Sequence, residues 1–247
     1  MGASSPESNR RATARTARLL VRRSELAALA TLLSGAPYAS LVVLAADLDG
    51  SPLLLLSDLA QATRNLKAEP RGSILVSAAE SGRDPLDSPR LTLIGRIEPT
   101  SEPRHRRRYL ARQPQSALYA DFGDFRFYRM ALERAHYVGG FGKIAWLEAR
   151  DLLTADIAQG FAGAEAALVE WINRERRAEL DLCANRLAGR GGEGWQATGV
   201  DPDGIDLRRA SDGDFARLDF AAPAPTDEAF RAAFSDLLAA AHSGGKN

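Results

Sequence analysis

Short apolar runs separated by turn signals fill the middle of this chain and limit its fold most strongly. Between residues 39 and 147 about six such runs occur, with only brief polar helical segments between them. A doubly wound parallel sheet needs a full-length helix after nearly every strand, and that spacing is missing here. The pattern therefore predicts a mainly β domain built as a small antiparallel barrel.

The individual elements follow from local periodicity and turn chemistry. Asp47–Gly50 has the composition of a hairpin turn. Apolar residues at helical spacing predict a helix over 16–33, which Gly35 and Pro37 would end. The expected strands are 40–46, 52–56, 72–78, 91–98, 125–130 and a final pair within 135–147, and the other expected helices are 59–68 and 103–113.

The last third of the chain has a different character. One long amphipathic helix is expected over 165–187, then a three-stranded meander, then a closing helix over 227–241 with Thr226 as its cap. We place the boundary within 151–163, which gives an antiparallel barrel domain at 16–150 and a smaller α+β domain at 160–243. The expected meander strands are 195–200, 204–209 and 215–220.

Composition narrows the class of protein. The formal net charge is zero, so nothing in the total favours a nucleic-acid partner. No apolar run approaches the roughly 20 residues that cross a membrane, and we expect no membrane partner. The lone cysteine, Cys183, cannot form an internal disulfide and is expected to be a buried structural thiol. The segment from Ser4 to Arg18 has a composition similar to that of a transit peptide, but a solvated lead-in to a helix is favoured, so we expect a cytoplasmic protein.

The polar segment Ser57–Pro70 is the candidate binding motif. It lies between two apolar runs and gathers two hydroxyls, an arginine and an amide within a few residues. Arginine offers a planar fork of donors, and a short helix adds the positive end of its dipole, so the grouping suits a phosphate. An ordinary surface helix with solvated Arg64 and Lys67 is an equally weighted alternative.

Two motifs in sequence order give a family resemblance. The run from Ser57 to Leu66 continues into Pro70–Leu75, and Val138–Ile144 follows later with the glycines of Gly-Gly-Phe-Gly. Residues 16–150 resemble the pyridoxamine-phosphate-oxidase-like, FMN-binding split barrel, and more narrowly its haem-utilisation branch of HugZ type. Residues 165–240 resemble the small domain that often follows this barrel, with 199–207 carrying the match.

The resemblance implies a homodimer with FMN sites between the subunits. The residues that it places near the phosphate or ribityl chain of FMN are Ser57, Thr63, Arg64 and Asn65, with Lys67 adding positive charge. The basic run Arg104–Arg108 could contribute, but a solvated face or a subunit contact is favoured. The glycine run is explained by a tight turn or bulge without any ligand.

One departure from the branch concerns the second domain. Where many members have a His-Met-Asn-x-Asp-His run, this chain reads Trp171-Ile172-Asn173-Arg174-Glu175-Arg176. Both histidines are missing, so a metal or haem role for that helix is not expected, and Trp171 is expected to be a packing residue.

The chain has three histidines, too few for a local His-rich metal site. His105 lies among arginines and is expected to face solvent. His136 could line the barrel near a ligand, although a structural role is favoured. His242 lies where some haem-degrading relatives supply an axial iron ligand, but a frayed tail is the favoured interpretation.

Three functions follow. The first is an FMN-dependent oxidoreductase that binds a small-molecule substrate, in which the protein positions the flavin. The second is a haem-binding, haem-degrading oxygenase with His242 or His136 as the iron ligand. The third is a dimer that stores or senses flavin or haem without catalysis.

Overall fold

The computed structural model describes residues 6–78, 84, 86–140 and 142–243. The chain divides into two compact units, Met1–Leu153 and Thr154–Asn247. Phe141 of the glycine run and half of the loop expected over 80–89 lie outside the described residues. Within the described chain, no helix is long and apolar enough to cross a membrane.

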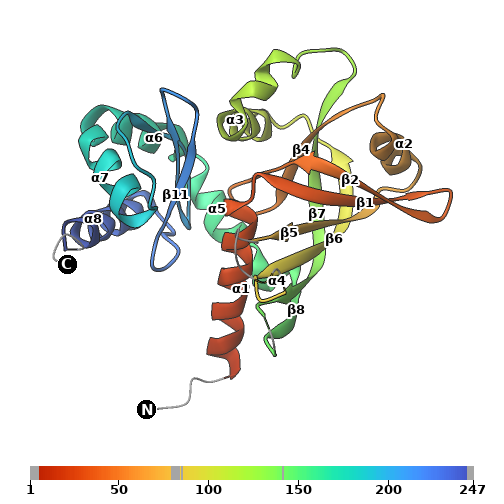
Figure 1. The fold of residues 1–247 in the computed structure, drawn as a ribbon, viewed down its shortest axis with the longest axis horizontal. Helices are drawn as coiled ribbons and strands as arrows, with labels where there is room; N and C mark the ends of the chain where they lie inside the picture. Colours follow the sequence, from red (N-terminus) through yellow and green to blue (C-terminus); the bar gives the residue numbers. More distant parts are fainter. Residues whose placement is uncertain (1–5, 79–83, 85, 141, 244–247) are drawn as a thin grey trace. The chain divides into compact units, whose positions relative to one another are not determined.

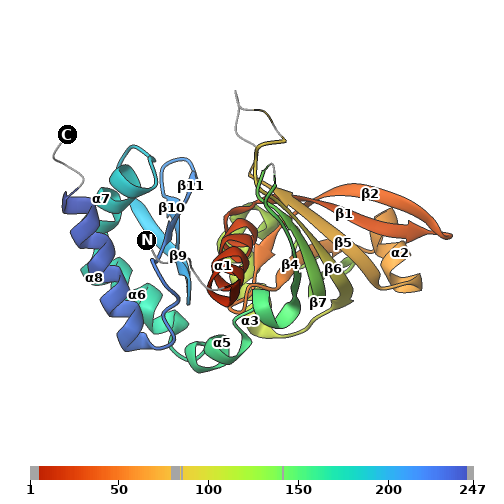
Figure 2. The same ribbon diagram turned by 90° about the horizontal axis from the view of Figure 1, so that it is seen from below.

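The first unit is built on one curled antiparallel sheet (Figures 1 and 2). Its strands run in the order β2-β1-β5-β6-β7-β4-β3, and β8 pairs with β7. This sheet is the split barrel that the short apolar runs predict. The strands are β1 (Leu26–Leu33), β2 (Ala36–Val43), β3 (Ala45–Ala46), β4 (Pro52–Ser57), β5 (Arg71–Ser77), β6 (Arg90–Pro99), β7 (Phe125–Val138) and β8 (Ile144–Glu148).

One long helix and several short ones connect and cover this sheet. They are α1 (Pro6–Arg23), α2 (Gln61–Ala68), α3 (Pro103–Arg112), the 3-10 turn η1 (Pro114–Leu118) and α4 (Ala149–Leu152). Helix α1 buries Ala14, Ala17 and Val21 against the barrel core. Helix α2 lies beside the β1–β2 hairpin, as Figure 1 shows.

The single helix expected over 16–33 is wrong, because its second half is strand β1. Helix α1 ends at Arg23, and Ser24 turns back so that its Oγ donates to the carbonyl of Leu20 at 2.8 Å. In β1 the side chains of Ala27, Leu29 and Thr31 are buried on alternate positions. The alternation is hidden in the sequence because the other face of β1 is also apolar. Gly35 is part of a hairpin turn rather than a helix stop, with Ser34 and Gly35 both at positive φ.

Turn chemistry is confirmed at two other hairpins of the first unit. The amide of Gly50 donates to the carbonyl of Asp47 at 2.9 Å, which closes the predicted turn before β4. The glycine run joins β7 to β8, and Gly140 and Gly142 both adopt positive φ. A tight turn therefore accounts for these two glycines without a ligand.

The second unit places helices beside a three-stranded antiparallel meander. The meander is confirmed as β9 (Trp195–Asp201), β10 (Gly204–Arg209) and β11 (Phe215–Asp219). Thr226 caps the closing helix α8 (Asp227–Ser243), since its Oγ1 accepts from the amide of Ala229 at 3.2 Å. The helix expected over 165–187 is two helices, α6 (Glu165–Glu175) and α7 (Arg177–Leu187), because Arg176 leaves helical geometry with φ −131°. A short helix α5 (Ala155–Phe161) precedes them.

Candidate functional site

The polar segment after β4 forms a structured corner of the first unit. Ser57 Oγ donates to Asp124 Oδ2 at 2.6 Å and accepts from the amide of Leu59 at 3.1 Å. Asn65 is buried, and its Nδ2 donates to Thr31 Oγ1 at 2.9 Å. Two of the predicted phosphate-binding groups are therefore engaged within the protein.

The remaining three predicted residues differ in availability. Lys67 Nζ pairs with Asp58 Oδ1 at 2.9 Å, which lowers the pKa of that carboxyl. Thr63 is fully buried, and its hydroxyl has no hydrogen-bond partner within the described residues. Arg64 is exposed, and its guanidinium forms no ion pair or hydrogen bond with the part of the chain that the structure describes. Arg64 is thus the available cation of this segment.

A cavity of about 390 Å³ opens beside the first turn of α2. Ser57 and Gln61 supply polar atoms to its wall, while Val42 and Leu56 supply apolar ones. Aromatic side chains from separate elements complete the lining: Tyr38, Tyr109, Tyr119 and Phe125. Ser40 also borders this space, and its Oγ is buried with no hydrogen-bond partner among the described residues. The cavity is large enough for a planar aromatic group and offers it polar contacts at one side.

His136 lies apart from this cavity lining, on the solvent side of the sheet. It stands on β7 opposite Trp146 of β8, and the two rings lie 4.6 Å apart between centroids. The guanidinium of Arg134 lies 5.0 Å from the Trp146 ring centroid. Neither ring nitrogen of His136 has a hydrogen-bond partner within the described chain. A half-buried imidazole without a partner is free to bind a metal centre.

The candidate residues of the second unit, His242, Trp171 and Cys183, each contact or are buried in the protein itself. His242 is exposed on α8, and its Nδ1 lies 2.7 Å from the carbonyl oxygen of Leu238. It belongs to a helix rather than to a frayed tail. Trp171 packs edge-to-face on Phe234 at 5.9 Å, as expected for a packing residue. Burial raises the pKa of the Cys183 thiol to about 11, so this cysteine is a buried structural thiol as expected. No cluster of metal-ligating side chains occurs among the residues that the structure describes.

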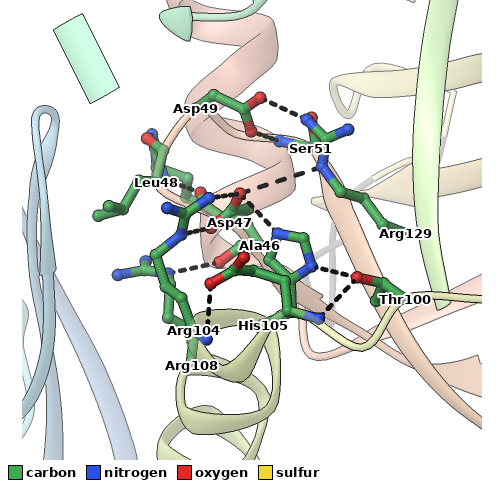
Figure 3. A network of polar contacts seen from close by, with 12 residues as sticks. Ala46, Asp47, Leu48, Asp49, Ser51, Thr100, Arg104, His105, Arg108 and Arg129 are labelled. Atoms are coloured by element: carbon green, nitrogen blue, oxygen red, sulfur yellow. Dashed lines mark hydrogen bonds and ion pairs between the residues drawn. The ribbon is translucent and has the colours of Figure 1, made fainter. Parts of the chain in front are cut away.

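The expectation that His105 faces solvent is wrong. Figure 3 shows the imidazole between Asp47 and Thr100, with Nε2 at 3.1 Å from Asp47 Oδ2 and Nδ1 at 2.8 Å from Thr100 Oγ1. Arg104 clamps the same carboxylate with two hydrogen bonds of 3.0 Å. Arg129 of β7 lies 4.0 Å from it. The basic run on α3 therefore mainly contacts the β3–β4 turn inside the protein. We call the group formed by Asp47, Arg104, His105 and Arg129 the Asp47 network.

The positive groups of this network keep the Asp47 carboxylate ionised. Burial alone would raise the pKa of Asp47, but hydrogen bonds from His105 and Arg104 hold the pKa well below its ordinary value. Since a carboxylate oxygen can only accept, His105 Nε2 donates to Asp47, while its Nδ1 contacts the Thr100 hydroxyl.

The curled sheet and its cavity define this chain as a split β-barrel protein. The family model described as "CREG, beta-barrel" matches residues 8–153, which is more than half of the chain. The chain belongs to this family. The narrower resemblance to the HugZ-type branch is not settled by this match.

Solved structures extend the likeness over both units. A protein of unknown function from Agrobacterium tumefaciens is 30% identical, covering 96% of this chain and 97% of its own, with a TM-score of 0.74. A protein from Mycobacterium smegmatis described as a heme binding protein is 29% identical over 98% of this chain and all of its own, with a TM-score of 0.56.

A curated relative matches a shorter part. "Non-canonical heme oxygenase HOZ, chloroplastic" from Arabidopsis thaliana is 41% identical over 111 residues. The match covers 43% of this chain and 33% of the relative, so the chain spans about a third of that protein's length.

Sequence reasoning found Ser57 at the cavity but missed the aromatic wall. Tyr38, Tyr109 and Tyr119 come from β2, α3 and the segment after η1, with no shared motif. The aromatic-rich stretch 119–128 is the local sign that could have drawn attention to this wall.

Proposed function

We propose that this chain binds haem on the exposed face of its split-barrel sheet, with His136 as the residue that would hold the iron. The observation that carries the proposal is the half-buried imidazole of His136, which has no hydrogen-bond partner among the described residues. Two relatives with haem in their names, from Mycobacterium smegmatis and Arabidopsis thaliana, support the choice of ligand.

The surroundings of His136 fit a flat, largely apolar ligand. Residues directly opposite one another in adjacent strands present their side chains on the same face. One such row crosses six strands and contains Leu41, Ala28, Leu75, Thr92, His136 and Trp146. Neighbouring strands lie about 4.8 Å apart, so the β6–β8 part of this row spans about 10 Å. Arg134 adds a cation that suits the propionate groups of haem.

Bound haem would supply iron chemistry to this face, and the residues present would hold and orient it. His136 would offer a neutral nitrogen to the iron, while Trp146 and Leu75 would cover the macrocycle. Haem degradation is the activity to assay after binding, with oxygen and an external reductant present, because one relative is named as an oxygenase.

We further propose that a second copy of the chain covers this face. Leu41, Leu75 and Trp146 are 74%, 43% and 52% exposed, an unusual density of large apolar side chains for a surface left in water. A second copy would also shield the side of the haem that faces away from the sheet. Sedimentation of Leu75→Glu tests this, with the exposed Leu187→Glu as control. The dimer is predicted to dissociate in the first variant alone, and a monomeric wild type would contradict the proposal.

Haem titration of two histidine variants tests the ligand assignment. His136→Ala is expected to weaken haem binding at least tenfold, whereas His242→Ala is expected to leave the dissociation constant unchanged. The two variants share the same chemical change, so they control for each other. Loss of binding in His242→Ala with retention in His136→Ala would move the ligand to α8.

A second candidate function is FMN binding in the aromatic cavity, with an oxidoreductase activity. The observation that favours it is the exposed Arg64 on α2, the helix whose first turn lines the cavity, since the Arg64 guanidinium has no partner among the described residues. Arginine binds phosphate through charge-assisted hydrogen bonds, and the tyrosine wall suits a planar ring system. In this proposal Ser57, Thr63, Asn65 and Lys67 surround the phosphate or ribityl chain.

Arg64→Ala is the test of the flavin proposal. Removing a charge-assisted phosphate contact is expected to cost about 2 kcal/mol, which is a roughly thirtyfold weaker FMN affinity. Arg71→Ala is the matched control, because Arg71 already pairs with Glu69 at 3.0 Å. Equal FMN titrations of wild type and Arg64→Ala would sink the assignment.

A further inference from the structure

Helix α3 turns a row of cationic side chains toward the β3–β4 turn and its neighbours. Arg104, Arg108 and Arg112 recur at every fourth position, so they share one face of the helix. Arg108 Nε donates to the carbonyl of Ala46 at 3.0 Å, and Arg112 Nη2 donates to that of Arg23 at 3.0 Å. These bonds fasten α3 along its whole length to chain segments far away in sequence.

The same helix carries a wall of the cavity. Tyr109 is 1% exposed, lines the cavity, and packs edge-to-face on Phe127 with centroids 5.6 Å apart. It follows Arg108 directly and lies little more than one turn beyond Arg104. The position of Tyr109 therefore depends on how α3 is held, at its first turn by Arg104 and beside Tyr109 by Arg108 and Arg112.

We propose that the Asp47 network is a positioning lock that fixes α3 and thereby sets the Tyr109 wall of the aromatic cavity. Asp47 is a positioning residue, since it acts through α3 and does not line the cavity. The positioning lock does not depend on which ligand the protein binds. Only the measurement of FMN affinity below rests on the proposed flavin function.

The Asp47 carboxylate is the centre of the lock because it joins cations from two elements. Arg104 of α3 binds it bidentately, and Arg129 of β7 lies within 4.0 Å. The turn itself is held by Arg22 of α1, whose Nη1 donates to the Asp47 carbonyl at 3.1 Å. Without the negative charge, the first turn of α3 would lose its bidentate bond to the β3–β4 turn, while Arg129 would keep its ion pair with Asp49 at 2.7 Å.

Chemical nitration of tyrosine, mapped by mass spectrometry, tests the lock without any ligand. Tyr109 is expected to resist nitration in the wild type and to react in Asp47→Asn and in the milder Arg104→Gln. Tyr137, which is buried in the barrel core, serves as the internal control and is expected to stay unreactive. Asp121→Asn is the matched control variant, because it removes the exposed ion pair of Arg106 on the same helix without touching Asp47.

Two outcomes would overturn the lock. In one, Tyr109 stays unreactive in folded Asp47→Asn and Arg104→Gln. In the other, Tyr109 and Tyr137 react together, which would show global loosening rather than release of α3. Titration with FMN adds a second readout, and both lock variants are expected to bind it at least tenfold more weakly than Asp121→Asn. If the wild type binds no FMN, the flavin proposal fails while nitration still decides the lock.

Discussion

The two units of the molecule each bury a charge cluster, and the central charges of the two clusters have opposite signs. In the first unit the carboxylate of Asp47 is surrounded by Arg104, His105 and Arg129. In the second unit the guanidinium of Arg217 is surrounded by three carboxylates, which are Asp201, Asp206 and Asp219. Burial alone would lower the pKa of Arg217, but these carboxylates raise the pKa well above its ordinary value.

The clusters differ in what they connect. Arg217 bonds to residues no more than 16 positions away, all at the β9–β11 meander, so its cluster secures one local motif. Asp47 bonds to α3 side chains 57 and 58 positions away, so its cluster joins separate elements of the barrel. A local cluster protects a fold, whereas a long-range cluster can also set the shape of a cavity.

They also differ in access to water. The central side chains Arg217 and Asp47 are 2% and 3% exposed, so they do not differ. The carboxylates around Arg217 are 1%, 13% and 11% exposed, whereas Arg104 and Arg129 around Asp47 are 28% and 32% exposed. A buried ion that loses its partner cannot be hydrated, while a half-exposed one can turn toward solvent. Breaking the second-unit cluster should therefore cost more stability.

Arg217→Ala gives the largest expected effect. Removing the cation leaves three carboxylates facing one another with little water, and we expect a loss of about 3–5 kcal/mol in the unfolding free energy of the second unit. Chemical denaturation followed by tryptophan fluorescence measures it, since Trp171 and Trp195 both lie in that unit. The exposed Arg186→Ala should change stability by less than about 0.5 kcal/mol.

Asp47→Asn is expected to cost less, about 2 kcal/mol, because Arg104 and Arg129 can be rehydrated and the amide keeps one acceptor. Denaturation curves of the two variants, recorded under the same conditions, provide the comparison. If Asp47→Asn lowers the unfolding free energy more than Arg217→Ala does, exposure to water does not explain the difference between the two clusters.

Acid titration sharpens the same contrast. The folded-state pKa of Asp47 lies below its ordinary value of 3.8, so its contribution to stability is complete above that pH. The contribution is lost as the pH falls from about 4 toward the folded-state value. The stability difference between wild type and Asp47→Asn should therefore shrink below pH 4, and a difference that grows there would reverse the assigned sign.

The smallest expected effect concerns the thiol of Cys183, a buried group without a charged partner among the described residues. Cys183 is completely buried, and its pKa of about 11 keeps it a neutral thiol at pH 7. A thiol reagent should label it in denaturant but not in the native protein. Rapid labelling of the native protein would show that α7 opens readily.

Turn chemistry made much of the fold predictable. The Asp47–Gly50 turn and the β9–β11 meander could be located from glycine, aspartate and proline positions, since these residues act locally. Strand β1 could not, because Leu26, Ala28 and Leu32 make its outer face apolar and hide the alternation. The break at Arg176 also has no local sequence sign.

The candidate site was only partly predictable, for a related reason. Arg64 could be recognised from its own neighbours, and it is the available cation of its segment. His105 could not, because its sequence neighbours are arginines while its decisive partner, Asp47, is 58 residues away. The tyrosines of the cavity likewise meet only after the barrel has folded.

Absorbance titration of wild type and His136→Ala with haem, followed by FMN, tests the central claim most directly. We expect a sharp Soret band in the wild type, its loss or displacement in His136→Ala, and the same FMN uptake in both proteins. FMN uptake thus reports that the variant is folded. An unchanged Soret band in His136→Ala would contradict the claim that this imidazole holds the iron.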